Sequence, residues 1–195
     1  MKKLRSLLVL ILLFSAVPYA QAQTLVQPEK YCFGADFAVK VDYLHFMDSN
    51  AGRINADNGT FIGAEFYKQL FFPNFFLGIE SGWGEANGKY FGFDTEFTYV
   101  PIELNAKYEI PLAQHLALSL GAGISGNWAQ IDLSIAGHED QWLFGGQFFA
   151  EINYKFRNCY FGLNVKYKLT EEKQFFLVPF AADNLTTGGQ IGLLF

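Results

Sequence analysis

The sequence has no apolar stretch long enough to cross a membrane as a helix. Its first apolar run, residues 7–17, is shorter than the roughly 20 residues that such a helix needs. The chain is also poor in basic residues, with 14 lysines and arginines against 19 acids, which argues against nucleic-acid binding. No polar stretch has the ligand spacing of a calcium-binding loop. These absences disfavour helical membrane proteins, nucleic-acid binders and calcium-loop proteins.

Residues 1–22 are predicted to be a secretory signal peptide. A basic start is followed by the short apolar run and by Ala20-Gln21-Ala22, the small-residue pattern that signal peptidase cleaves. No cysteine follows the apolar run directly, so a lipoprotein signal is not supported. Residues 23–195 have the length of one domain. Without the three basic residues of the leader, 11 remain against 19 acids, a net charge of −8.

The rest of the chain alternates apolar and polar residues. In the first such segment Phe37 and Val39 share one face, and Asp36, Lys40 and Asp42 share the other. Period-2 alternation is typical of a β-strand, and a face with two acids and a lysine cannot contact lipid cheaply. The pattern recurs in eight segments, which we expect to be strands: residues 31–43, 62–69, 75–83, 100–109, 116–128, 142–155, 161–168 and 184–195.

The predicted connections are of two kinds. Tight turns are expected at residues 71–74, 111–115 and 157–158, and more polar loops at 47–59, about 86–89, 130–141 and 171–183. Short turns at one end, longer loops at the other and an even number of strands are typical of outer-membrane barrels. Pro101 interrupts the fourth strand, where we expect a β-bulge or an unpaired donor.

The last segment ends as an apolar strand, whose edge would promote aggregation unless another strand covers it. The first strand is the simplest partner and closes the sheet. The sequence therefore predicts an all-β fold, an eight-stranded antiparallel up-and-down transmembrane β-barrel with its apolar face outward. The small inward residues of the fifth strand, such as Gly121, leave room for larger side chains opposite. Eight strands enclose a lumen that side chains just fill.

Two stretches carry a family resemblance: Thr98-Tyr99-Val100-Pro101-Ile102-Glu103-Leu104, followed by Lys107-Tyr108, and the closing Gly189-Gln190-Ile191-Gly192-Leu193-Leu194-Phe195. With them the chain from residue 23 onward resembles the outer membrane protein β-barrel domain family of small eight-stranded barrels. The resemblance implies residence in the outer membrane of a Gram-negative bacterium. It also implies that Phe195 is the signal that the barrel-assembly machinery recognises. It implies no shared chemistry and no cofactor.

Charged residues on the polar face of the strands are predicted to line the lumen. They are Asp36, Asp42, Glu65, Glu80, Glu103, Glu109 and Glu151, with Lys40, Lys107, Lys155, Lys166 and Lys168. Nearly balanced charge in a narrow barrel indicates a packed ion-pair network that fills the interior. The alternative is a narrow path for ions or protons.

The predicted loops are acidic. Their charged residues are Asp48, Asp57, Glu85, Asp94, Glu96, Asp132, Glu139, Asp140, Glu171, Glu172 and Asp183, against Arg53, Lys89 and Lys173. Carboxylates are suitable ligands for calcium and magnesium, so divalent cations would bridge this rim to lipopolysaccharide phosphates. The other interpretation, favoured by the irregular spacing of the acids, is a solvated rim without bound metal.

No catalytic or cofactor site is predicted. His138 with Ser134 and Glu139 has the composition of a lipid-modifying site, but nothing in the sequence fixes a base against a nucleophile. Residues 121–126 match G-x-G-x-x-G by letter, yet no helical pattern follows them.

Two further features leave alternatives open. Cys32 and Cys159 are predicted near the periplasmic rim, where an intervening strand separates them by about 10 Å against the roughly 7 Å that a disulfide tolerates, so two free thiols are favoured. The aromatic residues 175–180 are expected to belong to the outer aromatic girdle or, less favourably, to contact a partner or lipid.

We therefore expect an integral outer-membrane barrel with a packed polar lumen and a structural or surface-interaction role through its extracellular loops. The alternatives are a narrow pore or small-molecule conduit, a lipid-modifying enzyme and a soluble periplasmic binding barrel. The apolar outward face argues against the last of these. Outer-membrane lipid and lipopolysaccharide are the expected contacts, and the sequence does not identify a loop partner.

Overall fold

A computed structural model describes residues 34–47, 58–90, 93–134, 137–176 and 178–195 of the chain. The predicted signal peptide and Cys32 lie outside these residues. Within them, no helix has the length and apolar character to span a membrane.

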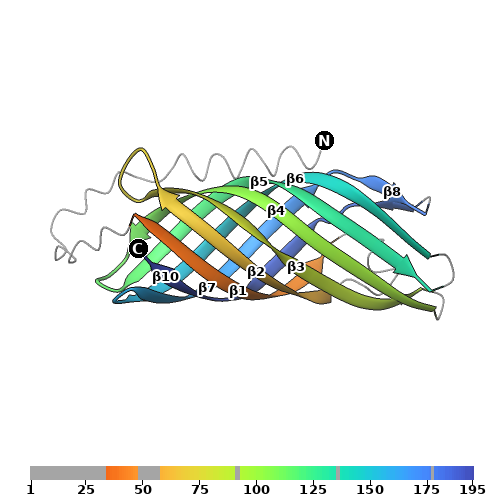
Figure 1. Cartoon of the computed structure of the whole chain (residues 1–195), viewed down its shortest axis with the longest axis horizontal. Coiled ribbons are helices and arrows are strands. Elements are labelled where there is room, and N and C mark those ends of the chain that lie inside the picture. The colour runs from red at the N-terminus through yellow and green to blue at the C-terminus, as the bar shows by residue number, and fades with distance from the viewer. Residues whose placement is uncertain (1–33, 48–57, 91–92, 135–136, 177) are drawn as a thin grey trace. The chain divides into compact units, whose positions relative to one another are not determined.

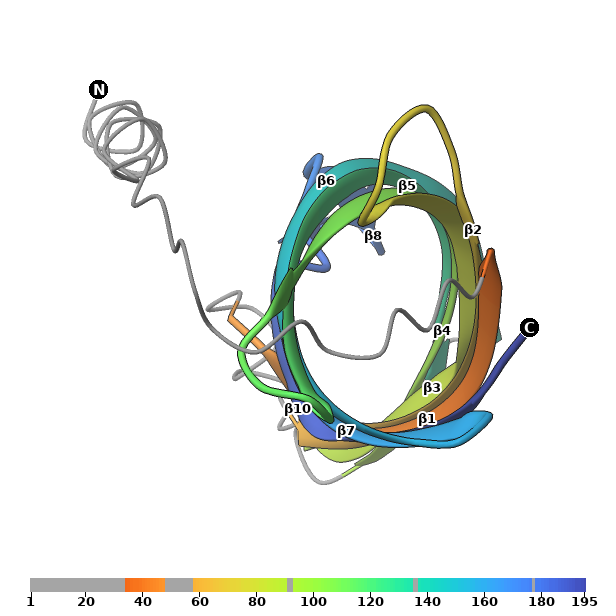
Figure 2. The same ribbon diagram turned by 90° about the vertical axis from the view of Figure 1, so that its left-hand side faces the viewer.

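Eight strands form a closed antiparallel barrel, in which β10 lies between β7 and β1 (Figures 1 and 2). A separate two-stranded sheet, β8 and β9, lies in the connection between β7 and β10. The barrel strands are β1 (Ala35–Phe46), β2 (Asn58–Gln69), β3 (Phe75–Tyr90), β4 (Phe93–Pro111), β5 (Leu116–Leu133), β6 (Gly137–Phe156), β7 (Cys159–Thr170) and β10 (Asn184–Leu194), and the hairpin strands are β8 (Lys173–Phe175) and β9 (Val178–Phe180).

The first and last barrel strands close the sheet. β1 pairs with β10 from Asp36↔Leu194 to Phe46↔Asn184. Beyond the last strand residue, the Phe195 amide donates to the Ala35 carbonyl at 2.9 Å, and the Ala35 amide donates back to Phe195 at 3.3 Å. The predicted closure is confirmed, and it leaves the barrel without a free edge.

The two faces of the sheet differ as the alternation predicts. Val41, Ile62, Ile124 and Leu163 are each 60% or more exposed on the outside. Charged residues such as Lys40 are buried on the inside. An apolar outer belt around a polar interior is the arrangement that a membrane-spanning barrel requires.

Small residues on the inner face accommodate aromatic rings. Gly121 pairs with Phe149, and a Cβ atom on Gly121 would lie 2.2 Å from the Phe149 ring. Gly192 faces the Tyr160 ring in the same way, also at 2.2 Å. The room expected opposite the fifth strand is therefore taken by an aromatic ring that lies flat over a glycine.

The tight turns fall where the sequence predicts them. β2 and β3 are joined through residues 70–74, where Phe71 and Asn74 have φ values of 67° and 65°. The connections at 112–115 and 157–158 are shorter still. The bulge expected at Pro101 is wrong, because Ser81↔Ile102 and Gly84↔Tyr99 keep one register on both sides of it. Proline has no backbone N–H, so it interrupts the ladder without adding a residue.

Two of the predicted loops are wrong, because both are strand. β3 continues through residues 86–89 and ends at Tyr90. β5 and β6 pair through most of residues 130–141, with Gln130 opposite Asp140 and Asp132 opposite His138. The four strands β3–β6 therefore have 16 to 20 residues, whereas β1, β2, β7 and β10 have 11 or 12.

The error has a physical cause, since the polarity of the two faces reverses along these four strands. The indoles of Trp83 and Trp128 donate hydrogen bonds to Glu85 at 2.7 Å and Asp140 at 3.1 Å, and these pairs mark the change. Beyond them the outward residues are mostly polar and the inward ones, such as Phe97, are mostly apolar, with Thr95 and Glu139 as inward polar exceptions. A strand that leaves the membrane has water outside it, so its composition resembles that of a loop. We call this part of β3–β6, residues 84–90, 93–99, 129–133 and 137–143, the extension.

Candidate functional site: the charge network of the lumen

The lumen contains a network of charged side chains. All twelve predicted lumen residues lie on inward positions of the barrel strands. Ten of them are buried, and Glu109 and Lys155 are partly buried near the tight-turn end. The network joins residues from six strands that are far apart in the sequence.

Lys40 on β1 lies at the centre of the network. Its ammonium group contacts Glu65 at 2.7 Å, Glu80 at 3.3 Å and Glu151 at 3.5 Å. These glutamates come from β2, β3 and β6, so a single lysine crosses the lumen and joins both walls. All four side chains are at most 1% exposed.

Glu103 on β4 is the most heavily bonded carboxylate of the network. It accepts hydrogen bonds from Lys166 at 2.7 Å and Lys168 at 2.6 Å, both on β7. Lys166 also contacts Glu80 at 2.6 Å, which connects this group to Lys40. Lys168 donates to the Tyr99 hydroxyl at 2.7 Å, toward the long-loop end of the barrel.

Lys107 continues the network toward the tight turns. Its ammonium group lies 3.5 Å from both Asp36 and Glu151 and 3.7 Å above the centre of the Tyr67 ring. The Tyr160 hydroxyl donates to Asp36 at 3.2 Å.

A separate pair lies at the tight-turn end of the barrel. Lys155 contacts Glu109 at 2.6 Å, with side chains 21% and 16% exposed. In barrels of this kind the tight turns face the periplasm, so this pair lies at the periplasmic mouth.

The strand register alone would make the network unfavourable. Glu65 lies directly opposite Glu80, and Glu80 directly opposite Glu103, so three acids form one row across β2, β3 and β4. Like charges directly opposite each other on neighbouring strands are destabilising. Lys40, on the neighbouring strand β1, compensates Glu65 and Glu80, whereas Lys166 and Lys168, on β7, reach Glu80 and Glu103 across the lumen. The network therefore depends on barrel closure.

Little space is left inside. One cavity lined by described residues, between Asp42, Glu80, Lys166 and Thr186, has a volume of ≈10 Å³. That is about the volume of one water-sized sphere. The arrangement of the described side chains is that of a filled interior.

Neutral side chains complete the network, and the sequence analysis did not include them in it. Asn127 accepts from Tyr99 and Lys168 and donates to Ser125 and to the Leu143 carbonyl. Gln147 donates to Asn105 at 2.7 Å, and Gln190 donates to Asn153 at 2.9 Å. The alternation already placed most of these residues inward, so their face was predictable but their partners were not.

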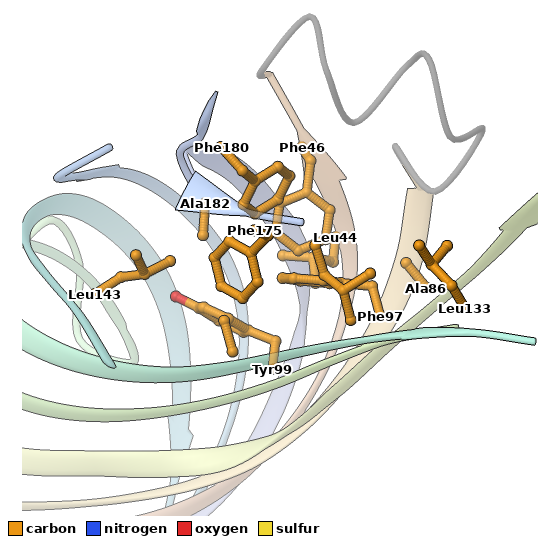
Figure 3. Close-up of a cluster of buried hydrophobic side chains, with 12 residues drawn as sticks. Leu44, Phe46, Ala86, Phe97, Tyr99, Leu133, Leu143, Phe175, Phe180 and Ala182 are labelled. Carbon is orange, nitrogen blue, oxygen red and sulfur yellow. The ribbon is translucent and has the colours of Figure 1, made fainter. Parts of the chain in front are cut away.

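An apolar layer covers the network at the long-loop end (Figure 3). It consists of Leu44, Phe46, Ala86, Phe97, Tyr99, Ala129, Ile131, Leu133, Leu143, Phe175, Phe180 and Ala182. Phe175 and Phe180 belong to the β8–β9 hairpin and are 2% and 3% exposed. The expectation that these aromatic residues belong to the outer girdle or contact a partner is therefore wrong, because both rings fold into the barrel. We call the barrel interior at this height, where the barrel-strand residues of this layer surround Phe175 and Phe180, the outer chamber.

His138 and Glu139, which with Ser134 have the composition of a lipid-modifying site, do not converge. His138 and Glu139 are neighbours on β6, so their side chains point to opposite faces of the sheet. Glu139 accepts a hydrogen bond from the Phe176 amide at 2.6 Å and another from Gln141 at 3.1 Å. Among the described residues, no group of three or more histidine, cysteine or acidic side chains is arranged to hold a metal ion. Cys159 has a free thiol, and the prediction for Cys32 lies outside these residues.

The fold, the apolar belt and the filled lumen define a small outer-membrane β-barrel protein. No family model matches the chain, and no curated protein sequence does. Solved structures do match it. Neisserial surface protein A aligns with a TM-score of 0.65 and 13% identity over 83% of this chain and 97% of that one. OprG from Pseudomonas aeruginosa aligns with a TM-score of 0.59 and 14% identity, covering 84% and 97%.

A third similar structure is Ail, the attachment invasion locus protein of Yersinia pestis. It aligns with a TM-score of 0.51 and 8% identity, covering 82% of this chain and 96% of that one. At these identities the similarity establishes the fold. The expected likeness to small eight-stranded outer-membrane barrels is confirmed.

Proposed function

We propose that this protein is a sealed barrel that anchors a cell-surface interaction, and that it neither conducts solutes nor catalyses a reaction. The observation that carries the proposal is the buried network, in which Lys40 joins three glutamates and Glu103 joins two lysines within 3.5 Å. Separating a buried ion from its partner costs several kcal/mol of free energy per ion, so the network resists opening. The apolar outer chamber is a second closure above the first.

The surface role is supported by the extension. It carries the sheet past the tryptophan pairs, and its outward face presents Glu85, Glu96, Asp132 and Asp140, all exposed. This height corresponds to lipid headgroups and the sugars beside them. We infer that the extension contacts lipopolysaccharide through hydrogen bonds to its sugars. Ail has been solved in complex with the heparin analogue sucrose octasulfate, but an acidic wall is a poor match for such a polyanion.

Planar bilayer recording tests the sealed lumen. The purified barrel, shown to be folded by its heat-dependent gel shift, is expected to insert without unitary conductance steps. A variant in which Lys40 and Glu103 are both replaced by alanine removes the two centres of the network and provides the comparison. Stable conductance steps in the unmodified protein would show that a conduit is the correct function.

Binding to vesicles that contain lipopolysaccharide tests the surface role. Asp140→Asn combined with Glu85→Gln is expected to change the apparent affinity, whereas Glu109→Gln, at the opposite end of the barrel, is not. Repeating the measurement with a chelator separates the two interpretations of the acidic rim. Loss of binding indicates bridging by divalent cations, and unchanged binding indicates a solvated rim. If the combined Asp140→Asn and Glu85→Gln variant binds as the unmodified protein does, the extension is not the contact surface.

A further inference from the structure

The walls of the outer chamber are formed by barrel strands, but the Phe175 and Phe180 side chains inside it come from the separate β8–β9 hairpin. The walls come from β1, β3, β4, β5 and β6, whose inward residues at this height are mostly apolar, with Thr95 on β4 and Glu139 and Gln141 on β6 as polar exceptions. Phe180 packs against this wall, with its ring centre 5.3 Å from that of Phe97 and 6.5 Å from that of Phe46. Phe175 packs edge-on against Phe180 at 5.7 Å. Two rings from one hairpin therefore lie inside an aromatic-lined chamber (Figure 3).

The hairpin that supplies these rings is independent of the barrel ladder. β8 and β9 pair only with each other, over three residues each. A two-stranded hairpin is at best marginally stable by itself in water, so this one depends on its contacts with the barrel. Polar tethers hold the hairpin at both ends. At its base Lys173 donates to the Trp142 carbonyl at 2.7 Å, and at its turn the Phe176 amide donates to Glu139. The first contact is exposed and the second is partly buried, so water can replace the first directly and the second once the turn moves outward.

The floor of the chamber determines which ligand would suit it. Lys168, Tyr99 and Asn127 form the floor. They hydrogen-bond to one another, Lys168 also donates to Glu103, and Asn127 also donates to Ser125 and to the Leu143 carbonyl. An anionic group would have to compete with Glu103 for Lys168. A cationic group would be repelled by the Lys168 ammonium. Exposed acids at the rim, including Glu171 and Glu172, also repel anions. The chamber therefore suits an uncharged molecule.

We propose that the outer chamber is a binding site for a small uncharged aromatic or alkyl molecule, whose place Phe175 and Phe180 hold in this structure. Such a ligand buries the same kind of surface as the two rings and exchanges with them, while the hairpin moves out into water. The network below remains closed, so the site has one entrance. This inference is independent of the surface role proposed above.

Toluene is the probe, because it has the shape of a phenylalanine side chain and no charge. The protein is placed in lipid nanodiscs with its alanine methyl groups labelled with carbon-13, and toluene is titrated by NMR. Ala129 and Ala86, which are 0% and 1% exposed in the chamber, report binding. Ala122, exposed on the lipid side, reports toluene that dissolves in the bilayer. Benzoate serves as the charged counterpart of the probe.

We expect toluene to shift the two chamber methyls in a saturable manner and benzoate to leave them unchanged. Replacing Phe175 and Phe180 together by alanine removes the occupants and is expected to tighten toluene binding at least tenfold. Phe161→Ala, on the lipid-facing side of β7, is the matched control and is expected to bind as the unmodified protein does. Exchange of the Phe176 amide with solvent should rise as toluene saturates the unmodified protein.

Two results would overturn the proposal. The first is a double variant that is folded by its gel shift but whose chamber methyls do not respond to toluene. The second is a response confined to the double variant, since the site would then be an engineered cavity that the unmodified protein does not offer.

Discussion

Glu103→Gln is the substitution that should damage this barrel most for the smallest change in shape. Glutamine has nearly the same volume as glutamate, but it presents an amide that carries no charge. In the structure, Lys166 and Lys168 both donate to the Glu103 carboxylate, at 2.7 Å and 2.6 Å, and all three side chains are at most 6% exposed. The substitution leaves two buried ammonium groups short of compensation.

The size of the effect follows from the loss of one partner in a buried ion pair. Removing one partner destabilises a protein by about 3–5 kcal/mol, because the other charge stays buried and unpaired. Lys166 keeps Glu80 at 2.6 Å, whereas the only carboxylate contact of Lys168 within 4.0 Å among the described residues is Glu103. Most of the loss should therefore come from Lys168.

Urea unfolding of the barrel refolded into lipid vesicles, followed by the gel shift, measures this loss. Glu109→Gln is the matched control, because Glu109 pairs with Lys155 at 2.6 Å but both side chains are partly exposed. An exposed pair contributes about 0–1 kcal/mol, so the control should lose little stability. Adding Lys168→Met to Glu103→Gln removes the unpaired charge and should restore at least about 1 kcal/mol of the free energy of unfolding, because neighbouring residues have non-additive effects in a double-mutant cycle.

The reasoning is refuted if Glu103→Gln and Glu109→Gln lower the free energy of unfolding equally. It is also refuted if the changes in the free energy of unfolding caused by Lys168→Met and Glu103→Gln simply add in the double variant. Either result would mean that water or the lipid environment compensates the lumen charges, and that the ion pairs do not seal the barrel.

Three further predictions concern other parts of the barrel. Phe195→Ala keeps both backbone hydrogen bonds of the last residue, so refolding into detergent should be unchanged. The substitution removes the predicted recognition signal, so assembly in cells should be reduced. An equal loss in both assays would contradict the prediction that Phe195 is a recognition signal. Gly121→Ala places a methyl group 2.2 Å from the Phe149 ring and should lower the free energy of unfolding in urea by about 1–3 kcal/mol. The control Gly146→Ala, whose added methyl would have its nearest neighbour at 3.4 Å, should lower it little. Similar losses for the two variants would contradict the packing argument. The pKa of Glu171 is lowered because it accepts a backbone hydrogen bond from β6 and one from the Lys173 side chain. This tether is therefore present above the ordinary pKa of a glutamate and lost as pH falls through the lowered value. The protection of its β6 donor against hydrogen exchange, relative to the intrinsic rate at each pH, should therefore fall on acidification more than it does in Glu171→Gln, and equal profiles would contradict this prediction.

The sequence by itself determined the barrel and the direction of each side chain within it. Period-2 alternation divides the residues of a strand between two faces. Because lipid surrounds the barrel and the lumen is polar, Lys40 must face the lumen and Val41 must face the lipid. The tight turns were predictable for the same local reason, because residues such as Asn74 tolerate positive φ. Where the environment changed from lipid to water, the same alternation reversed its polarity. The extension was therefore mistaken for loop.

Only the tertiary structure decided which lumen charges meet and what covers them. Lys166 and Glu80 are 86 residues apart in the chain and 2.6 Å apart in the barrel, and this distance depends on how far the strands are staggered when the sheet closes. The β8–β9 hairpin has a composition that equally suits an outward girdle. Its rings turn inward because the inner face of the extension is apolar and would otherwise be open to water.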